Sequence, residues 1–533
     1  MTTSPPAESP PVHPGPPARE PAPAATRLRA LAARPATALP ALAALAVLVS
    51  VAGLFTFPAT LDEAYVYALT QHGLTGLLDG WREDPQALLP QLIALPFGAA
   101  DAMWALRLPS LIAFAAAVAA TWWAARPLAG PLVAAGGAAL MALSPLGTAT
   151  ATDARWPAWA LLTVVLAWGA LLRAARTGAP RWWVLYALAL ATGIWANALV
   201  VLMVPAHALA LLALTHRRRL LPWLASLAAP AAAAIPLALA VRASDAPNPL
   251  VRTSVPTLTE VPGFLATLVA TGAPERIRQL ATLACVLVVA AGLVTLRRRD
   301  TGARAPRPAP PRQAVVLLGW AVLPLAAAFL ISQTGDSVWQ GRYVLGVLPA
   351  AGLLVTWSAV RIGGRVGVAL WAAVAIGFAG LTGHVHLRAQ GEPTDSWAAL
   401  LAAQSPPGAA VIFSEAEGVQ AAGYYEPRFR TAEDEVIVPA WDRTPVPDGI
   451  VLLDHPTFDR LPPAPPSAAL VRRLANLHGI VTMALRPPSV QAPGVRWAER
   501  NCLVERTMFD GALIVAVRDC RLPARGTRPE QQR

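Results

Sequence analysis

The stretch LPALAALAVLVSVAGLFTFP, residues 39–58, is 20 residues long and carries no charge. A helix that crosses the hydrocarbon core of a bilayer needs about 20 apolar residues, so this run predicts a membrane-spanning helix. Residues 1–38 are rich in Pro, Ala and Ser and have no apolar period, which predicts a disordered tail. A cleaved signal peptide does not begin with a polar segment as long as residues 1–38, so we expect the apolar run to stay in the protein as a membrane-spanning helix.

The composition of the whole chain extends this prediction. The 533 residues are 55% hydrophobic and 14% charged, and the mean hydropathy is +0.48. Soluble proteins carry about 25% charged residues, so the chain is predicted to be a polytopic α-helical membrane protein. The net charge of +12 comes from arginine alone, since there is no lysine. Arg use of this kind, with abundant Ala and Pro, is typical of a GC-rich genome, so we do not interpret the charge as nucleic-acid binding.

Ten further apolar runs follow the first, which gives about eleven predicted spans and a transmembrane domain over residues 39–384. The runs lie near 107–126, 130–145, 156–174, 182–198, 199–215, 219–241, 278–296, 313–332, 343–360 and 365–384. Two of them, 182–198 and 199–215, are short arms of a tight hairpin predicted near Asn197.

Arginines in the short loops predict the orientation, because basic residues stay on the cytoplasmic side. With the N-terminus in the cytoplasm, the inside loops contain Arg126; Arg176 and Arg181; Arg217, Arg218 and Arg219; Arg297, Arg298, Arg299, Arg304, Arg307 and Arg312; and Arg361 and Arg365. The outside segments are then 59–106, 146–155, 242–277, 333–342 and everything after 385. This alternation predicts a multi-pass plasma-membrane protein.

The first outer loop, 59–106, contains two semi-apolar stretches, at 64–78 and 87–100. Both are too short to span a bilayer, and prolines interrupt the region. We expect amphipathic helices that lie on the outer membrane surface.

Residues 385–533 have more charge and shorter apolar segments, and we expect a small α/β domain outside the cytoplasm. AVIF (410–413) and GIVLLD (449–454) are typical of buried strands, whereas 396–404 and 467–479 are typical of helices. If this domain is exported, a disulfide between Cys502 and Cys520 is expected. Cys285 lies in an apolar run, where a small core residue is the simpler interpretation.

Charged side chains are concentrated where the chain leaves the membrane on the predicted outer side. Asp62 and Glu63 follow the first span, with Tyr65 behind them, and Asp153 and Arg155 lie in the second outer loop. Each has a simple structural explanation: acids favour helix starts, and an Asp–Arg pair can be a surface salt bridge. In the fourth outer loop, Arg342 stands beside Tyr343, where an interfacial arginine can simply snorkel.

Taken together, these loops predict a site on one membrane face. Arginine binds phosphate oxygens through bidentate, charge-assisted hydrogen bonds. A carboxylate can take the proton of an attacking hydroxyl group. Such a surface would suit a lipid-linked phosphate.

Four sequence blocks, in this order, resemble the GT-C glycosyltransferases of glycosyltransferase family 39. The blocks are DEAYVYALTQHG (62–73), WALRLPSL (104–111), DARWPAWALL (153–162) and GRYVLGVLPA (341–350). That family includes protein O-mannosyltransferases and bacterial aminoarabinose transferases acting on lipid A. The tail, around GYYEPR (423–428), also resembles tails of actinobacterial members.

The resemblance implies a membrane enzyme that moves a sugar, mannose or similar, from a polyprenyl-phosphate donor with inversion at the anomeric carbon. The acceptor would be a hydroxyl group of a lipid, a glycan or a protein. Asp62 and Glu63 match the catalytic Asp-Glu motif of the family. Arg155 and Arg342 would bind the donor phosphate, with Asp153, Tyr65 and Tyr343 in support. The resemblance leaves open a divalent cation, for which His72 is a candidate ligand.

Two other classes remain open from the sequence. A transporter or lipid flippase would usually show repeated halves and polar groups in mid-membrane, whereas these acids lie at the ends of loops. A membrane scaffold without catalytic activity is also open, because residues 84–90 lack the His-Pro-Pro-Leu block common in family 39. If Asp62, Asp153 and Arg342 line one outer cavity, the transferase is favoured; if they are scattered, the scaffold is.

Overall fold

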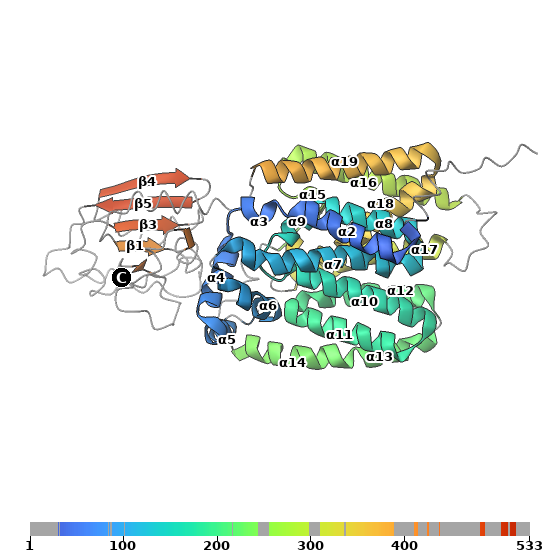
Figure 1. The fold of residues 1–533 in the computed structure, drawn as a ribbon, viewed down its shortest axis with the longest axis horizontal. Helices are drawn as coiled ribbons and strands as arrows, with labels where there is room; N and C mark the ends of the chain where they lie inside the picture. Colours follow the sequence, from blue (N-terminus) through green and yellow to red (C-terminus); the bar gives the residue numbers. More distant parts are fainter. Residues whose placement is uncertain are drawn as a thin grey trace, which may run out of the picture.

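The computed structural model is a bundle of long helices with a small β-sheet beyond one end (Figure 1). It describes residues 30, 32–83, 85, 88–100, 102–215, 217–243, 255–297, 310–334 and 337–388 of the helical part, and residues 410–413, 424–425, 436–437, 480–484, 503–509 and 512–518 of the C-terminal part. Most of the predicted N-terminal tail therefore lies outside the described residues.

Each of the predicted apolar runs forms helix. The first is α2 (Pro35–Ser50) with α3 (Gly53–Thr56). The others are α7 (Met103–Ala129), α8 (Pro131–Leu143) with α9 (Pro145–Ala151), α10 (Pro157–Thr177), α11 (Pro180–Ala196), η1 (Ala198–Met203) with α12 (Val204–Leu214), α13 (Leu220–Ser226) with α14 (Ala228–Ala243), α16 (Glu275–Val294), α17 (Pro310–Ser332), η6 (Gly341–Val347) with α18 (Leu348–Ile362), and α19 (Gly364–Arg388). Shorter elements join them: η2 (Arg217–Arg219), η4 (Leu258–Glu260), α15 (Val261–Ala270) and η5 (Thr295–Arg297).

The number of membrane spans depends on three of these helical units. Among the described residues, eight helices are long and apolar enough to cross a membrane, or nine if α8 and α9, bent by 70° at their junction, form one span. The break predicted near Asn197 is present, because Asn197 ends α11 and its side chain accepts from the Leu199 backbone at the start of η1. The two arms pack mainly on other helices, α11 on α10 and α14 and α12 on α17. Each arm is only 17 residues long. Whether these two arms cross the bilayer therefore decides between nine and eleven spans.

Proline and glycine set several of the helix boundaries. Helices α8 and α10 each begin with proline, which needs no backbone hydrogen-bond partner at a first position. Gly178 ends α10 with a φ of +69°, a left-handed conformation that side chains rarely adopt. The neighbouring α7–α8 junction uses Gly130, at a φ of +87°.

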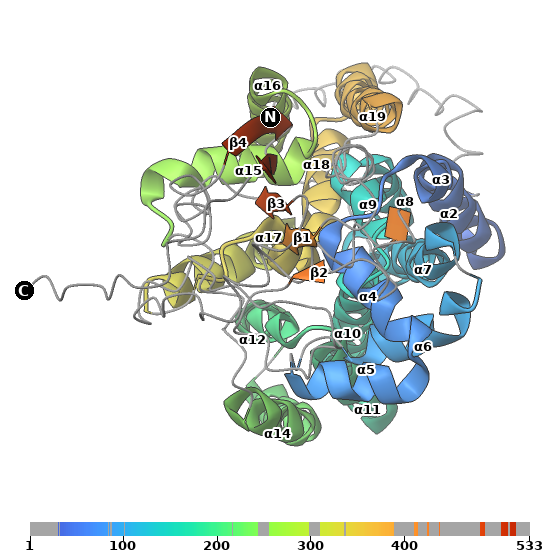
Figure 2. The ribbon, with the colours of Figure 1, turned by 90° about the vertical axis from the view of Figure 1, so that its left-hand side faces the viewer.

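The core lies where α7, α8, α10 and α18 pack together, and Trp122, Trp168 and Trp320 are fully buried in it. The helices α14, α16 and α19 lie at the edge of the bundle (Figure 2) and expose many apolar side chains. His207 is also fully buried in the bundle, and its Nδ1 atom lies 3.0 Å from the Tyr186 hydroxyl.

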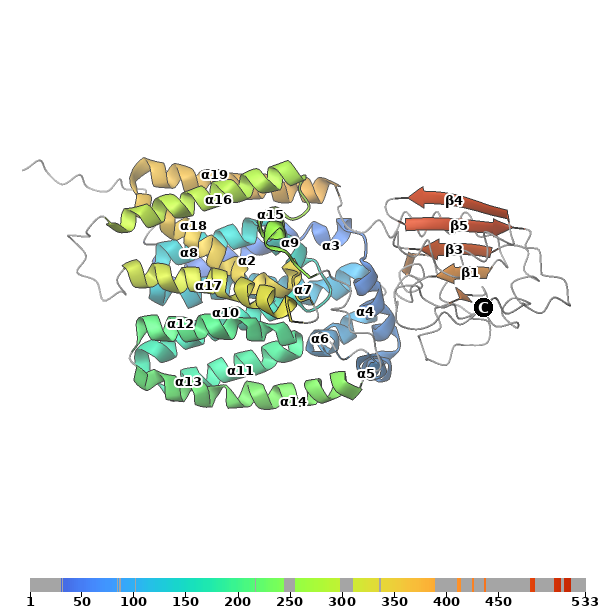
Figure 3. The same ribbon diagram turned by 180° about the vertical axis from the view of Figure 1, so that it is seen from behind.

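The first outer loop contains α4 (Leu61–Gln71), α5 (Gly73–Glu83) and α6 (Leu88–Gly98). The loop therefore contains three helices where two were predicted, because Gly73, with a φ of +67°, divides the first predicted stretch into α4 and α5. All three lie at the end of the bundle that faces the sheet, whereas the α12–α13 link lies at the opposite end (Figures 1 and 3). Their position on an outer membrane surface stays a prediction.

The C-terminal strands form one mixed sheet in the order β2-β1-β3-β5-β4. Strands β1 (Ala410–Phe413), β2 (Val436–Ile437) and β3 (Ile480–Ala484) are parallel, whereas β5 (Ala512–Arg518) runs antiparallel to β3 and to β4 (Leu503–Phe509). The predicted strand at 410–413 is therefore confirmed. The strand predicted at 449–454 and the helices at 396–404 and 467–479 lie outside the described residues, and the domain boundary at 385 stays a prediction.

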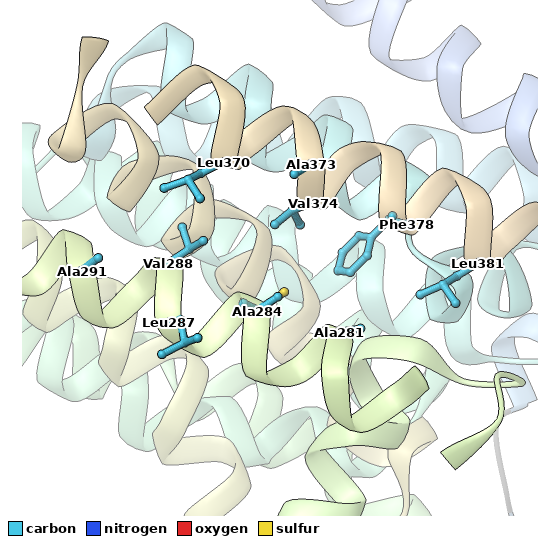
Figure 4. A pocket seen from close by; sticks show the side chains of 12 residues that line it. Ala281, Ala284, Leu287, Val288, Ala291, Leu370, Ala373, Val374, Phe378 and Leu381 are labelled. Atoms are coloured by element: carbon cyan, nitrogen blue, oxygen red, sulfur yellow. The ribbon is translucent and has the colours of Figure 1, made fainter. Parts of the chain in front are cut away.

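An apolar groove of about 440 Å³ runs between α16 and α19 (Figure 4). Val288 of α16 faces Leu370 and Phe378 of α19 across it (Figure 4), and Leu287 and Cys285 are also part of its lining. None of the predicted site residues lines this groove.

The predicted orientation can be tested with reporter fusions. A phosphatase that folds only outside the cytoplasm is expected to be active when fused after residue 390 and inactive after residue 305, because basic loops stay inside. A cytoplasmic fluorescent reporter at the same two positions is expected to give the opposite pattern. Reversed results would overturn the predicted orientation and place the candidate site in the cytoplasm.

The disulfide prediction concerns cysteines outside the described residues, but they flank a described strand pair. Cys502 precedes β4 and Cys520 follows β5, and the first residue of β4, Leu503, pairs with Arg518. Maleimide labelling of denatured, unreduced protein is expected to modify only Cys285, and reduction should expose two more thiols. A Cys285→Ala variant supplies the control, because it should label only after reduction. Labelling of this variant without reduction would contradict the disulfide.

Candidate functional site

The first turn of α4 begins with a complete capping box. The Thr60 hydroxyl accepts from the Glu63 backbone N–H at 3.2 Å, and the Glu63 carboxylate accepts from the Thr60 backbone N–H at 3.0 Å. This arrangement pairs two of the backbone donors that a helix start leaves unsatisfied. Glu63 therefore fixes where α4 starts and which way its first turn faces.

Glu63 also forms a buried ion pair with Arg107 of α7. Arg107 Nε and Nη2 donate to the two Glu63 carboxylate oxygens at 2.8 and 2.7 Å, and both side chains are only 2% exposed. The Ala154 backbone N–H, from the second outer loop, donates to Glu63 Oε1 at 2.9 Å. One carboxylate thus joins the first outer loop, α7 and the second outer loop.

Arg107 uses its remaining donors on the chain just before α4. It donates to the Phe57 carbonyl at 2.8 Å and to the Pro58 carbonyl at 2.9 Å. Burial alone would raise the pKa of the Glu63 carboxyl, but Arg107 and the backbone donors outweigh it, so the pKa is lowered and Glu63 is ionised. The sequence interpretation assigned no role to Arg107, although an arginine inside an apolar helix is itself a signal of a buried partner.

Asp62 points to a different set of partners. Its Oδ2 atom forms an ion pair with Arg155 Nη1, and Arg342 Nη1 lies 3.0 Å from the same oxygen. The Asp62 side chain is 41% exposed. The structure thus brings together three predicted site residues from three separate outer loops.

Asp153 holds Arg155 in place with both carboxylate oxygens. Arg155 Nε and Nη2 donate to Asp153 Oδ1 and Oδ2, each at 2.8 Å. Burial raises the pKa of the Asp153 carboxyl, and the nearby Glu63 carboxylate adds to the effect. The bidentate contact with the Arg155 guanidinium opposes this effect and favours the ionised form of Asp153.

Aromatic rings border this charge cluster. Trp156 stacks on Tyr343 with ring centroids 5.7 Å apart, and the Arg342 guanidinium lies 5.3 Å from the Tyr343 centroid. Arg342 Nε also donates to Gln340 at 2.8 Å. The predicted supporting residue Tyr65 points elsewhere: its hydroxyl lies against Gly80 of α5.

The predicted cation ligand His72 is exposed at the C-cap of α4. In the part of the chain that the structure describes, no group of three or more His, Cys, Asp and Glu residues could hold a metal ion. Asp62 and Asp153 are both occupied by guanidinium groups. A divalent cation at this site therefore stays a prediction.

Two tyrosines of the C-terminal part reach this region. The Ala59 backbone N–H donates to the Tyr425 hydroxyl at 2.6 Å, and the Met103 backbone N–H donates to the Tyr424 hydroxyl at 3.0 Å. Sequence reasoning noted GYYEPR only as part of a family resemblance. No sequence pattern connects residues 366 positions apart, so the contact itself could not be predicted.

Comparisons with known proteins agree with this fold. Residues 88–241 match the family described as dolichyl-phosphate-mannose-protein mannosyltransferase, and no curated protein sequence matches the chain. The crystal structure of ArnT from Cupriavidus metallidurans in the apo state is similar with a TM-score of 0.56 at 14% identity, over 93% of this chain and 98% of that one.

A second structure of the same protein, ArnT from Cupriavidus metallidurans bound to undecaprenyl phosphate, is similar with a TM-score of 0.55 at 13% identity, over 89% of this chain and 97% of that one. The family match and the shared fold confirm the resemblance to GT-C glycosyltransferases of family 39 that the sequence blocks indicated.

Proposed function

We propose that the chain is a membrane glycosyltransferase that moves a sugar from a polyprenyl-phosphate donor to an acceptor hydroxyl group. The observation that carries the proposal is the convergence of Arg155 and Arg342 on one oxygen of Asp62. Two guanidinium groups from separate loops make a site for a single anionic oxygen. The undecaprenyl phosphate bound in the structurally similar ArnT supports a donor of this class.

In this proposal the donor phosphate competes with Asp62 for the two arginines. A phosphate oxygen would take the position that Asp62 Oδ2 has against Arg155 and Arg342. Arg155 stays in place because Asp153 binds it from the other side. Asp62 is then released from both cations, and a carboxylate without a neighbouring positive charge is a stronger base. Donor binding would thus prepare the base for the acceptor.

The reaction follows from this arrangement. The acceptor hydroxyl gives its proton to Asp62 while its oxygen attacks the anomeric carbon. The bond between that carbon and the phosphate oxygen breaks, and its electron pair leaves with the polyprenyl phosphate. Arg155 and Arg342 stabilise the charge that develops on the leaving phosphate. Attack from the face opposite the phosphate inverts the anomeric centre, and we expect a mannose-like sugar from the family resemblance.

Glu63 has a different part in the proposal, although it shares the Asp-Glu motif. It is buried in its pair with Arg107 and in hydrogen bonds to two backbone N–H groups. A carboxylate held in this way cannot accept a proton without losing those contacts. We assign it the role of a positioning residue that fixes α4 against the second outer loop.

The clustering of Asp62, Arg155 and Arg342 favours a transferase over a flippase or a scaffold without activity. A scaffold without activity has no need of three outer loops that meet at one carboxylate. A flippase would carry its polar groups in mid-membrane, whereas Asp62 and Arg155 lie outside the candidate spans. The proposed site lies at the end of the bundle that carries α4 to α6 (Figure 3).

The first test of this function replaces Asp62 with Asn. Asp62→Asn keeps the size of the side chain but cannot accept the proton, so transfer from radiolabelled polyprenyl-phosphate-mannose in membranes should fall about 10²- to 10⁴-fold. Binding of undecaprenyl phosphate should be retained or tightened, because the competing carboxylate is gone. Arg342→Gln should instead weaken binding.

Asp79→Asn is the matched control for this test, because Asp79 lies in the same outer loop with a side chain that is 64% exposed and paired with Arg82. It should leave transfer and binding unchanged. Transfer at the wild-type rate by Asp62→Asn would show that Asp62 is only part of a helix start.

The second test concerns stability. Glu63→Gln leaves the Arg107 cation buried without its partner, which should lower the free energy of unfolding by about 3–5 kcal/mol. Asp79→Asn breaks an exposed pair and should lower it by at most about 1 kcal/mol. Thermal unfolding of purified protein in detergent measures both. The double variant Glu63→Gln with Arg107→Met should recover part of the loss, and equal midpoints for Glu63→Gln and Asp79→Asn would contradict the structural role.

A further inference from the structure

The C-terminal part contacts the helical part through Tyr424 and Tyr425, at positions that matter for the site. Their hydroxyl groups accept hydrogen bonds from Met103 and Ala59, which are 321 and 366 residues away. Both donor residues are almost fully buried, Met103 at 5% and Ala59 at 1% exposure. Buried backbone N–H groups need a partner, and here the partner comes from the far end of the chain.

The two N–H groups belong to the starts of the helices that carry the Glu63–Arg107 pair. Met103 is the first residue of α7, which carries Arg107, and Ala59 directly precedes Thr60, the N-cap of α4. The first N–H groups of a helix have no partner within the helix. Helix α4 satisfies its own donors with Thr60 and Glu63, but α7 has no side-chain cap from its own N-cap residue, Ala102. Tyr424 therefore acts as a cap for α7.

The rings add a second contact to both outer loops. Tyr424 packs edge-to-face on Tyr67 of α4 with centroids 5.0 Å apart, and on Tyr425 with centroids 4.9 Å apart. The same apolar cluster contains Leu106 and Ala154. Ala154 is the neighbour of Asp153 and Arg155 and donates to Glu63. The tyrosine pair thus packs against the cluster that contains Ala154, which connects the second outer loop to Glu63.

We propose that Tyr424 and Tyr425 are positioning residues through which the C-terminal part holds α4, α7 and the second outer loop in the arrangement that transfer requires. This inference rests on the proposed function for its effect on turnover, but the docking contact stands on its own geometry. It gives the C-terminal part a role: its docking supports the site, and Tyr424 and Tyr425 do not themselves take part in the reaction. Undocking would loosen the base Asp62 more than Arg342, which η6 carries separately.

The experiment compares Tyr424→Phe/Tyr425→Phe with wild type in the full-length protein. Each substitution removes only the accepting hydroxyl oxygen and keeps the ring. Hydrogen exchange read by mass spectrometry should become faster in peptides that cover residues 57–63 and 101–107, because two buried N–H groups lose their partners. Transfer turnover per folded molecule should fall roughly 3- to 30-fold, with the KM for the polyprenyl-phosphate donor changed less than threefold.

A matched control separates positioning from simple stability. Tyr186→Phe removes another buried tyrosine hydroxyl, one that bonds to Trp223 and His207 inside the bundle. It should lower the thermal midpoint but leave turnover per folded molecule and the exchange of 57–63 unchanged. If the double Phe variant behaves in the same way as Tyr186→Phe, the tyrosine pair has no positioning role and the inference is wrong.

Failure of the inference and failure of the proposed function give different results. If the exchange of 57–63 and 101–107 becomes faster but wild type transfers no sugar from any polyprenyl-phosphate donor, docking stands and the proposed function fails. If wild type transfers sugar and the double variant changes neither exchange nor turnover, the docking inference is overturned while the proposed function stands.

Discussion

The buried ion pair between Glu63 and Arg107 is the contact on which the arrangement of the site depends. Burying two charges is unfavourable unless nearly all of their hydrogen-bonding groups are satisfied. Here two backbone N–H groups donate to Glu63 and two backbone carbonyls accept from Arg107, in addition to the hydrogen bonds within the pair. The requirement for so many partners brings the end of the first span, the start of α4 and the second outer loop to one place.

The direction of Asp62 follows from this pair. Consecutive residues in an α-helix point about 100° apart, so a Glu63 that faces the protein interior turns Asp62 toward the open side. There Asp62 meets Arg155 and Arg342. The two carboxylates of one motif therefore divide their tasks: one is a buried structural anion and the other is partly exposed beside two cations. A motif that looks like a catalytic pair in the sequence is asymmetric in space.

The sequence predicted the parts of the structure that depend on local pattern. Apolar runs of sufficient length define the helices, and arginines at their ends define a consistent alternation. The sequence also indicated that Asp62, Asp153, Arg155 and Arg342 would lie together, since charge beside a membrane span is conspicuous, and they do; their place on the outer face stays a prediction. Arg107 was missed because its block reads as an apolar span. The sequence could show that Asp62 and Glu63 diverge, but which of them is buried depends on Arg107.

The contact between the C-terminal part and the helical part could not be predicted from one sequence. Tyr424 and Tyr425 lie in a stretch whose composition suggests only a small exported domain, and nothing local indicates that their hydroxyl groups cap helix starts in the membrane part. Helix α9 was likewise missed, because residues 146–155 were predicted as an outer loop, whereas Pro145–Ala151 is a helix bent by 70° from α8. Ser144 caps α9 and Pro145 is its first residue. Both are local signals of a helix start, which were overlooked because only the apolar character of the run was considered.

The charges of the site also constrain how it can work. Asp62 and Asp153 balance Arg155 and Arg342, so an arriving phosphate adds negative charge to a cluster that is already neutral. Two responses are open to the protein: Asp62 can leave the arginines, or Asp153 can take up a proton. Burial raises the pKa of Asp153 and so favours proton uptake, but protonation would weaken its bidentate contact with Arg155. In the proposed mechanism, displacement of the more exposed Asp62 is therefore the response that keeps Arg155 in position for the phosphate. The residue that leaves is then the one that has to meet the acceptor hydroxyl.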